Sequence, residues 1–513
     1  MGALEVWSDI SPNDINQGEL YRGISTMEAR ISELQQFLKV AGILNQEEFD
    51  SINSGHSLAT VEGISPMDMN WVLHCAALVF LMQLGFASFE AGMCRPDNVI
   101  TTYVKNITDF TLGTAAALLC GFAFAHGQVP FKDHISAWKF FFHLVFQATA
   151  STICSGAMAE RTNVIGYMLI SVFLACFVYP LSVNITWGGG YLSQMDPPFH
   201  DFAGSGVVHI LGGSAALAGV MVVGPRYRRW KRPEMFVCHS VPQVLCGMLL
   251  LWVGWFGFNP GSTGAMSTQQ AAQYASNAAM TTSISPAAAG SFTIFYDIYL
   301  TEFEHLDVVR IANCVISGLV AITSGCNVLS PWASVLVGGM SCVVYVYGTR
   351  LLHKLEIDDV VDAVPVHLFN GAWGCIATGL LHPDKGLLTT GMWGLLGTQL
   401  ISIVVLAGVG FIPVYGLCWL LKRQRMLRAP LEAEIMGLDL YIFAAQAYAN
   451  MDEVDDAYDD IPADNEPPPE VEASSDNDEG YPDTFRSFGP PRLPRRKVGN
   501  MSLTAESFMV HYT

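Results

Sequence analysis

Long apolar runs between about residue 66 and residue 424 constrain this chain most strongly. Each is close to the roughly twenty residues that cross a bilayer as a helix. In lipid, backbone N–H and C=O groups must be paired within the segment, so the runs predict helices. A large soluble protein is excluded because only 14% of the 513 residues are charged. We count about eleven runs, which begin near residues 70, 107, 137, 164, 203, 236, 275, 309, 332, 362 and 391.

Basic residues fall on one set of the loops that join these runs. Arg226–Arg232 and Lys422–Arg425 are strongly basic, whereas residues 188–200, 259–276 and 324–332 contain no Lys or Arg. Cytoplasmic loops carry the excess of Lys and Arg in membrane proteins. With about eleven spans, this distribution places the N-terminus outside the cell and the C-terminus in the cytosol.

The two ends of the chain differ from its apolar middle. Residues 1–65 are polar, and apolar residues between Ile24 and Leu38 recur at spacings of three and four. They predict an amphipathic helix that either self-associates or packs on the membrane domain. Residues 451–513 are acidic and Pro-rich, end in a basic cluster, and should remain disordered. The expected divisions are an extracellular extension (1–65), a membrane domain (66–424), a cytoplasmic segment (425–450) and the acidic tail (451–513).

The twelve cysteines show neither disulfide nor metal-ligand spacing, so we expect no metal and no cofactor. No nucleophile–base pair is visible either, which argues against an enzyme.

Two similar strings place ionisable residues within apolar runs. Asp201 precedes His209 by eight residues, and Asp359 precedes His367 by the same number. Polar residues inside a span are costly and are therefore candidates for function. If each string is helical, each His lies about 12 Å, or two turns, beyond its Asp. The strings fall in the fifth and tenth runs, which predicts two inverted five-helix repeats followed by a final helix.

A single histidine in a helix is more often a packing residue than a functional one. The symmetric pair His209 and His367, each followed by small residues, favours a functional site instead. Two facing imidazoles could share one proton and offer both a donor and an acceptor to a small polar solute such as ammonia or water.

Aromatic and Gly-rich segments stand at the ends of the fourth and sixth runs. Trp187–Gly190 and Trp252–Ser262 combine large rings with glycines, which break helices and let backbone approach closely. Two interpretations remain open. The rings either form the aromatic belt common at membrane interfaces, or they line a vestibule in which ring faces and a hydroxyl hold a small cation.

Taken together, these motifs resemble the ammonium transporter family, Amt/Mep/Rh, and its Amt branch in particular. The resemblance runs from about residue 68 to about residue 440. It implies eleven spans, a homotrimer in the plasma membrane with one narrow pore per subunit, ammonium or methylammonium as solute, and no nucleic-acid partner. The motifs follow in the family's order: Phe89–Gly92, Ser155–Thr162, Trp187–Gly190, Asp201–His209, Trp252–Ser262, Gly318–Thr323 and Asp359–Gly371.

The resemblance also implies roles for individual residues. Trp187, Ser262 and Phe146 would form the outer ammonium site, with Asp201 keeping that site attractive to a cation. Phe146 and Phe258 would form the gate beneath it. His209 and His367 would line an apolar lumen.

The expected function is therefore a transporter that recruits NH4+, removes its proton and conducts NH3, with or without that proton. The alternative is an ammonium sensor that signals through its cytoplasmic tail. Conduction of a neutral gas, as in the Rh branch, is a third possibility, against which Trp187 and Ser262 argue. Glu434–Tyr448 resembles the family's regulatory tail, where cytoplasmic regulators could bind, but has Phe443-Ala444-Ala445 in place of the usual His-Gly-Glu.

Overall fold

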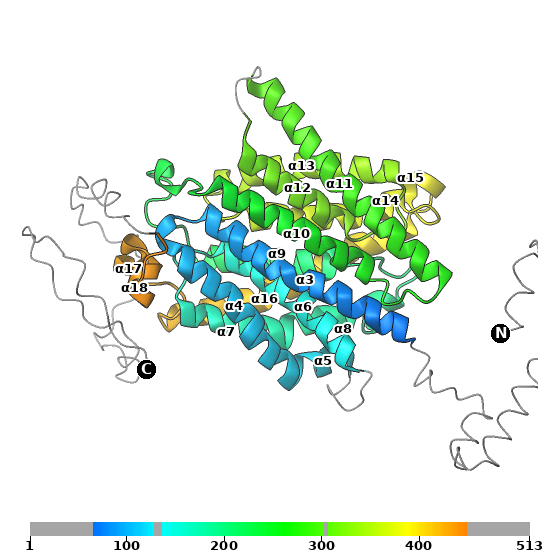
Figure 1. Ribbon diagram of the computed structural model, residues 1–513, viewed down its shortest axis with the longest axis horizontal. Helices are drawn as coiled ribbons and strands as arrows, with labels where there is room; N and C mark the ends of the chain where they lie inside the picture. Colours follow the sequence, from blue (N-terminus) through cyan, green and yellow to red (C-terminus); the bar gives the residue numbers. More distant parts are fainter. Residues whose placement is uncertain (1–64, 128–135, 302–305, 449–513) are drawn as a thin grey trace, which may run out of the picture. The chain divides into compact units, whose positions relative to one another are not determined.

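The computed structural model describes residues 65–127, 136–301 and 306–448. Within these ranges the regular elements are helices, and the one β-type contact is an isolated bridge between Thr162 and Arg428. The longer helices are shown in Figure 1: α3 (Pro66–Met93), α4 (Val99–Ala116), α6 (Ser136–Ala157), α7 (Val164–Phe173), α9 (Leu211–Val223), α10 (Val241–Gly261), α11 (Gln269–Thr301), α12 (Val308–Ile322), α13 (Pro331–Lys354), α14 (Asn370–Leu381) and α16 (Gly394–Arg423).

Shorter helices extend or connect these. The α-helical ones are α5 (Phe122–His126), α8 (Tyr179–Ile185), α15 (Leu387–Thr390), α17 (Leu431–Met436) and α18 (Leu438–Phe443). Three 3₁₀ turns cover Pro96–Asn98, Tyr191–Gln194 and Pro233–Phe236. Four π-helical turns cover Ala117–Gly121, Leu174–Val178, Ser205–Ile210 and Val364–Phe369, the last two leading into α9 and α14.

Eight helical segments in the described ranges are long and apolar enough to cross a membrane, and the chain is a multi-pass membrane protein. The prediction of an all-helical membrane architecture is confirmed. Helices α6, α11 and α12 lie at the other three predicted runs, and α12 is apolar but only 15 residues long. The number of eleven crossings and the orientation of the termini stay predictions.

The second run was placed too late by the sequence analysis. Its helical segment begins at Pro96, not near residue 107. The first turns of α4 carry Lys105, Asn106 and Asp109, which lowered the apparent hydropathy there, yet all three side chains are buried inside the protein.

Contacts divide the described chain into two units. The smaller one contains residues 65–72 and 264–272. In it, the carboxylate of Asp68 accepts hydrogen bonds from the backbone N–H groups of Met266 and Ser267 at 2.6 and 2.7 Å. The larger unit contains residues 73–263 and 273–448, and the features below belong to it.

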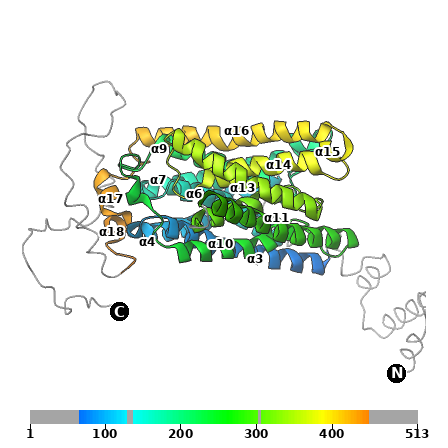
Figure 2. The ribbon, with the colours of Figure 1, turned by 90° about the horizontal axis from the view of Figure 1, so that it is seen from above.

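Small residues allow the helices of the larger unit to pack closely. Helix α9 packs against α6 and α16 (Figure 2), and α12 packs against α10, α13 and α14. A Cβ atom at Gly374 would lie 2.2 Å from the carbonyl oxygen of Ala321, so only glycine fits between α14 and α12 at this point.

The helix break expected within Trp252–Ser262 is wrong, because α10 continues to Gly261. Its glycines serve close packing instead: a Cβ at Gly254 would lie 2.1 Å from Cγ of Met82 in α3. In lipid, a continuous helix also keeps the backbone hydrogen-bonded. The segment Trp187–Gly190, by contrast, is not helical: α8 ends at Ile185, and Gly189 has a φ of 82°.

The segment after α16 is folded back on the larger unit. Asp439 in α18 accepts hydrogen bonds from the N–H groups of Ile100 and Thr101 at 2.7 and 2.6 Å, and therefore caps the start of α4. The N–H of Leu438 donates to Oδ1 of Asn98 at 3.1 Å. The helix expected around residues 24–38 and the acidic tail 451–513 lie outside the described residues.

Candidate conduction pathway

Asp201 and Asp359 stand in loops, each just before the π-helical turn that leads to its histidine. The carboxylate of Asp201 accepts the N–H groups of Gly204, Gly206 and Val207 at 3.1, 2.8 and 2.9 Å. Oδ2 of Asp359 accepts the N–H of Val364 at 2.7 Å. The first N–H groups of a helix lack intrahelical acceptors, and these carboxylates accept their hydrogen bonds instead.

The expectation of a continuous two-turn helix from each Asp to its His is therefore wrong. Gly204 has a φ of 114° and Asp362 a φ of 59°, so the chain is not helical between each aspartate and the turn that follows. Capping the turn requires the carboxylate to lie ahead of it, outside the helix.

The two histidine segments enter the larger unit from opposite ends. Asp201 precedes α9, whereas Arg226 follows it and binds Asp358, next to Asp359, through a 2.8 Å ion pair. The start of the second segment therefore lies where α9 ends. An inverted repeat requires this arrangement, although the repeat itself stays a prediction.

The structure brings His209 and His367 together. Their Nδ1 atoms lie 3.1 Å apart, and their rings are nearly parallel, with centroids 5.2 Å apart. Both side chains are buried. In an Nδ1–Nδ1 hydrogen bond one ring donates and the other accepts, so the pair holds one shared proton. Nε2 of His209 makes no hydrogen bond to any described residue.

Aromatic rings connect this pair to an exposed tryptophan. Phe146 and Phe258 stack with centroids 3.9 Å apart and an angle of 12°. Phe258 lies 5.7 Å from the ring of His209, and Phe146 lies 6.3 Å from Trp187. Both phenylalanines are buried, while Trp187 is 41% exposed. The stacked rings leave no space between them, so the path from Trp187 to the histidines is closed at this point.

Hydrogen bonds fix the exposed end of this series. Nε1 of Trp187 donates to the carbonyl oxygen of Asp201 at 2.8 Å, so the string that carries His209 also positions the tryptophan. The hydroxyl of Ser262, one turn beyond Phe258, donates to the carbonyl oxygen of Phe258 at 2.8 Å. Of the contacts described, none joins Ser262 directly to Trp187.

Sequence reasoning missed two residues that support the histidines. Trp255 stacks on His209 with centroids 5.5 Å apart, and its Nε1 donates to Oγ1 of Thr323 at 3.1 Å. Trp255 lies three residues before Phe258, one helical turn away. That spacing on one face of α10 was the signal that could have identified it.

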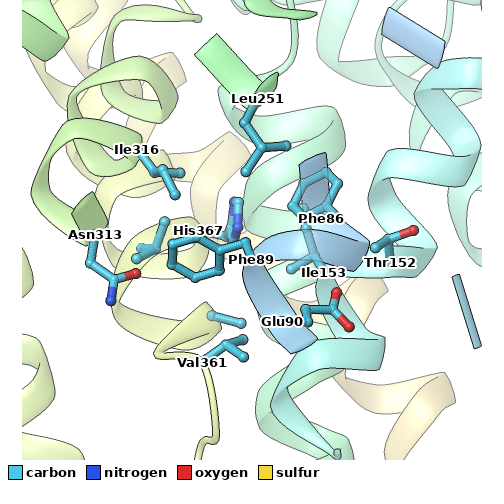
Figure 3. A pocket seen from close by; sticks show the side chains of 12 residues that line it. Phe86, Phe89, Glu90, Thr152, Ile153, Leu251, Asn313, Ile316, Val361 and His367 are labelled. Atoms are coloured by element: carbon cyan, nitrogen blue, oxygen red, sulfur yellow. The ribbon is translucent and has the colours of Figure 1, made fainter. Parts of the chain in front are cut away.

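A small cavity lies on the other side of the histidine pair (Figure 3). Its polar lining side chains are His367, Glu90, Thr152 and Asn313. Its volume of about 20 Å³ is enough for one or two water molecules. Among the residues that the structure covers, no group of three or more His, Cys, Asp or Glu side chains could hold a metal ion. The apolar lining residues are Phe86, Phe89, Ile153, Leu251, Ile316, Val361, Ala363 and Val366.

A buried ionic network occupies the end of the protein where α9 finishes. Arg226 pairs with Glu160 and Asp358 at 2.8 Å each, and Arg95 pairs with Glu160 at 2.7 Å. Burial alone would raise the pKa values of Glu160 and Asp358, but the arginines outweigh it and lower both. From the sequence, Arg226 was interpreted only as one of the basic residues of a cytoplasmic loop.

Comparison with known proteins agrees with this architecture. A family model described as Ammonium Transporter Family matches residues 70–448. Ammonium transporter Amt2 of Archaeoglobus fulgidus is 38% identical over 423 residues, which cover 75% of this chain and 89% of that protein. Ammonium transporter 1 member 3 of Solanum lycopersicum is 36% identical over 428 residues, with 74% and 92% covered.

Solved structures resemble the fold over the same region. One described as a Sensor Amt Protein has a TM-score of 0.67 and 29% identity, with 73% of this chain and 97% of that chain covered. Candida albicans Mep2 has a TM-score of 0.65 at 24% identity, with 72% of this chain and 87% of that chain covered. At this identity, the comparison shows a similar fold alone. Since the family match spans the helices, both histidine segments and the aromatic series, this chain belongs to the ammonium transporter family.

Proposed function

We propose that this protein transports ammonium across the plasma membrane, and is a transporter rather than an enzyme. The observation that carries the proposal is the continuous series of rings from the exposed Trp187, through Phe146 and Phe258, to the buried pair His209 and His367. Family membership supports ammonium as the solute, with methylammonium as its analogue.

The outer site recruits NH4+. The face of Trp187 attracts a small cation, and Phe146 provides a second ring edge-on to it. Asp201, whose carbonyl oxygen accepts the Nε1–H of Trp187, contributes negative charge near this site, while the hydroxyl of Ser262 can accept a hydrogen bond from the solute. K+ has the same charge and a similar size but offers no hydrogen-bond donor.

The stacked phenylalanines then favour loss of the proton. An unpaired cation in an apolar passage is far more costly than a neutral polar molecule. NH3 can pass once the rings of Phe146 and Phe258 separate, and the free Nε2 of His209 can meet it on the other side. The proton can follow along the shared His209–His367 hydrogen bond, in which case transport is electrogenic. K+ cannot lose a proton and is rejected.

We further propose that eleven helices cross the membrane, with the N-terminus outside, the C-terminus in the cytosol and three copies in the assembly. The eight apolar spans together with α6, α11 and α12 make eleven. The orientation is supported by the basic loops, because cytoplasmic loops carry the excess of Lys and Arg in membrane proteins.

The test is ammonium-evoked current in oocytes that express the chain, with K+ and methylammonium as comparisons. We expect a saturable current for ammonium and none for K+. His209→Leu and His367→Leu should each abolish the current at saturating ammonium, because the shared proton is lost. An unchanged current in either variant refutes the role of the pair.

The chain offers a matched control for these substitutions. His126 and His143 form another pair, with Nε2 of His126 3.2 Å from Nδ1 of His143, but lie among Phe122 and Tyr179 instead of on the ring series. His143→Gln should leave the ammonium current unchanged.

A sensor is the second candidate, and the likeness to a solved Sensor Amt Protein favours it. The two functions separate in cells that lack ammonium uptake. Growth rescue at low ammonium identifies a transporter, whereas ammonium binding without current or rescue identifies a sensor.

A further inference from the structure

The cavity beyond the histidine pair contains an amide without a partner. Asn313 in α12 is 1% exposed, and neither its Nδ2 nor its Oδ1 makes a hydrogen bond to any described residue. Leaving a buried amide without a hydrogen-bond partner is costly. Since the cavity can contain one or two waters, water there would satisfy Asn313. Figure 3 shows His367, Glu90 and Asn313 around this same space.

Glu90 connects the cavity to a group of charged residues buried between α3, α4, α6 and α7. Nδ2 of Asn106 donates to Oε2 of Glu90 at 3.2 Å. Lys105, one residue earlier, donates through Nζ to the carbonyl oxygen of Ser155 at 3.0 Å. Glu90, Lys105 and Asp109 are each at most 2% exposed. Three ionisable side chains buried together in the apolar part of a membrane protein require an explanation.

Hydrogen bonding indicates how charge is divided within this group. Asp109 accepts hydroxyl groups from Tyr167 at 2.6 Å and from Ser171 at 2.7 Å, the pattern of an ionised carboxylate. The ammonium group of Lys105 offsets that charge. Glu90 is then the remaining acid, and burying a second negative charge without an offsetting cation is costly. The group is neutral when Glu90 is protonated and gains one negative charge when Glu90 releases its proton.

We propose that Glu90 is a proton-relay residue that receives, through water in the cavity, the proton that leaves the histidine pair. The inference rests on the proposed transport of ammonium and specifies how the proton leaves the pair. It is carried by the shared cavity, the unpartnered Asn313 and the charge balance of the buried group.

The proton steps balance without any co-reactant. NH4+ gives a proton to water at the Trp187 site, and that water gives one to Nε2 of His209 when the rings of Phe146 and Phe258 separate, so that an N–H bond forms there as an O–H bond breaks. The shared proton then shifts to His367. His367 gives a proton to cavity water, which passes one to the carboxylate of Glu90, where an O–H bond forms. Glu90 lies in the last turn of α3 and releases its proton to water beyond Met93. NH3 leaves separately and binds a proton again in solution.

The experiment uses the purified full chain in liposomes. Ammonium-evoked charge movement and ammonia entry, followed with an internal pH dye, are measured side by side. Glu90→Gln keeps the shape of the side chain but cannot exchange a proton. We expect its current to fall at least about 10-fold, a modest loss for a proton-transfer group, while ammonia entry continues. Glu90→Asp should restore current, with an altered pH profile and solvent isotope effect.

Two further variants complete the test. Asn313→Leu makes the cavity wall apolar and should lower current while ammonia entry continues. If Glu90→Gln does not fold, the current of Asn313→Leu is the measurement that tests the relay. Ser88→Ala, in the same helix but outside the cavity, is the control, since Ser88 donates to the carbonyl oxygen of Gln243. Folding is checked by thermal unfolding.

The outcomes separate this inference from the proposed function. Wild-type current and pH profile in folded Glu90→Gln overturn the relay, as does wild-type current in Asn313→Leu if Glu90→Gln is unfolded. Ammonia entry without charge movement in the wild-type protein also overturns it, while transport stands. Neither entry nor current in the wild-type protein refutes the proposed function itself.

Discussion

Trp187 is the member of the ring series that solvent reaches, and in the proposed function its exposed face holds the cation. Trp187→Leu removes a cation–π contact that contributes about 0.5–2 kcal/mol. We expect the ammonium concentration for half-maximal current to rise by about 2- to 30-fold, with little change in maximal current. Trp393→Leu, at an exposed tryptophan away from the series, is the control. Loss of maximal current with unchanged half-saturation would contradict this role.

Asp201 combines a structural and an electrostatic contribution, and two substitutions can separate them. Asp201→Ala leaves three N–H groups at the start of the His209 segment without an acceptor, and should abolish transport and lower thermal stability. Asp201→Asn keeps one accepting oxygen and should recover part of the stability, but not transport, because the negative charge is gone. Uptake of labelled methylammonium and thermal unfolding measure the two effects. A fully active Ala variant would remove Asp201 from the mechanism.

At this scale, the matching Asp-to-His spacing allowed His209 and His367 to be selected from the sequence. Phe146 and Phe258 were selected only through the resemblance to the family. The cavity with Glu90 could not be foreseen from spacing. It forms from α3, α6, α10, α12 and the second histidine segment, and only their packing shows which side chains share one space.

Among the elements, α18 is attached to the start of α4 through the carboxylate of Asp439 and through the hydrogen bond from Leu438 to Asn98. Asp439→Ala removes the acceptor for the N–H groups of Ile100 and Thr101, a loss of about 0.5–2 kcal/mol for a helix cap. Trypsin should then cut after Lys422, Arg423 or Arg425 faster, by about 2- to 30-fold if local opening limits cleavage. Glu432→Ala, at an exposed acidic residue in α17, is the control. Equal cleavage rates would show that other contacts hold the segment.

Element boundaries were predictable where hydropathy changed sharply, as at α13 and α16. They were less so where polar residues are buried by neighbouring helices, as in α4. Glycines misled the analysis in α10, because the sequence does not show whether a glycine marks a turn or a close approach to another helix.

Across the whole molecule, the buried ionic network connects segments that are far apart in the chain. The pKa of Glu160 is lowered from its ordinary value of 4.5 in the folded protein. Its contribution to stability is therefore present above about pH 4.5 and is lost as pH falls through the lower folded value. Glu160→Gln should unfold at a lower temperature than wild type at pH 7, and the difference should shrink below about pH 4.5.

The control for this series is Glu432→Gln, which removes an exposed carboxylate and should leave the unfolding temperature nearly unchanged at each pH. A difference between Glu160→Gln and wild type that persists undiminished at pH 3 would mean that packing, and not charge, accounts for the effect.

The face-to-face contact of Phe146 and Phe258 has a consequence for the cell as well as for the solute. Rings 3.9 Å apart leave no room for liquid water between them. In the proposed function, the path through the protein therefore opens only for single molecules. Vesicles densely loaded with it should therefore shrink under osmotic shock no faster than empty ones. A cell could then hold many copies and feed on scarce nitrogen without losing control of its volume.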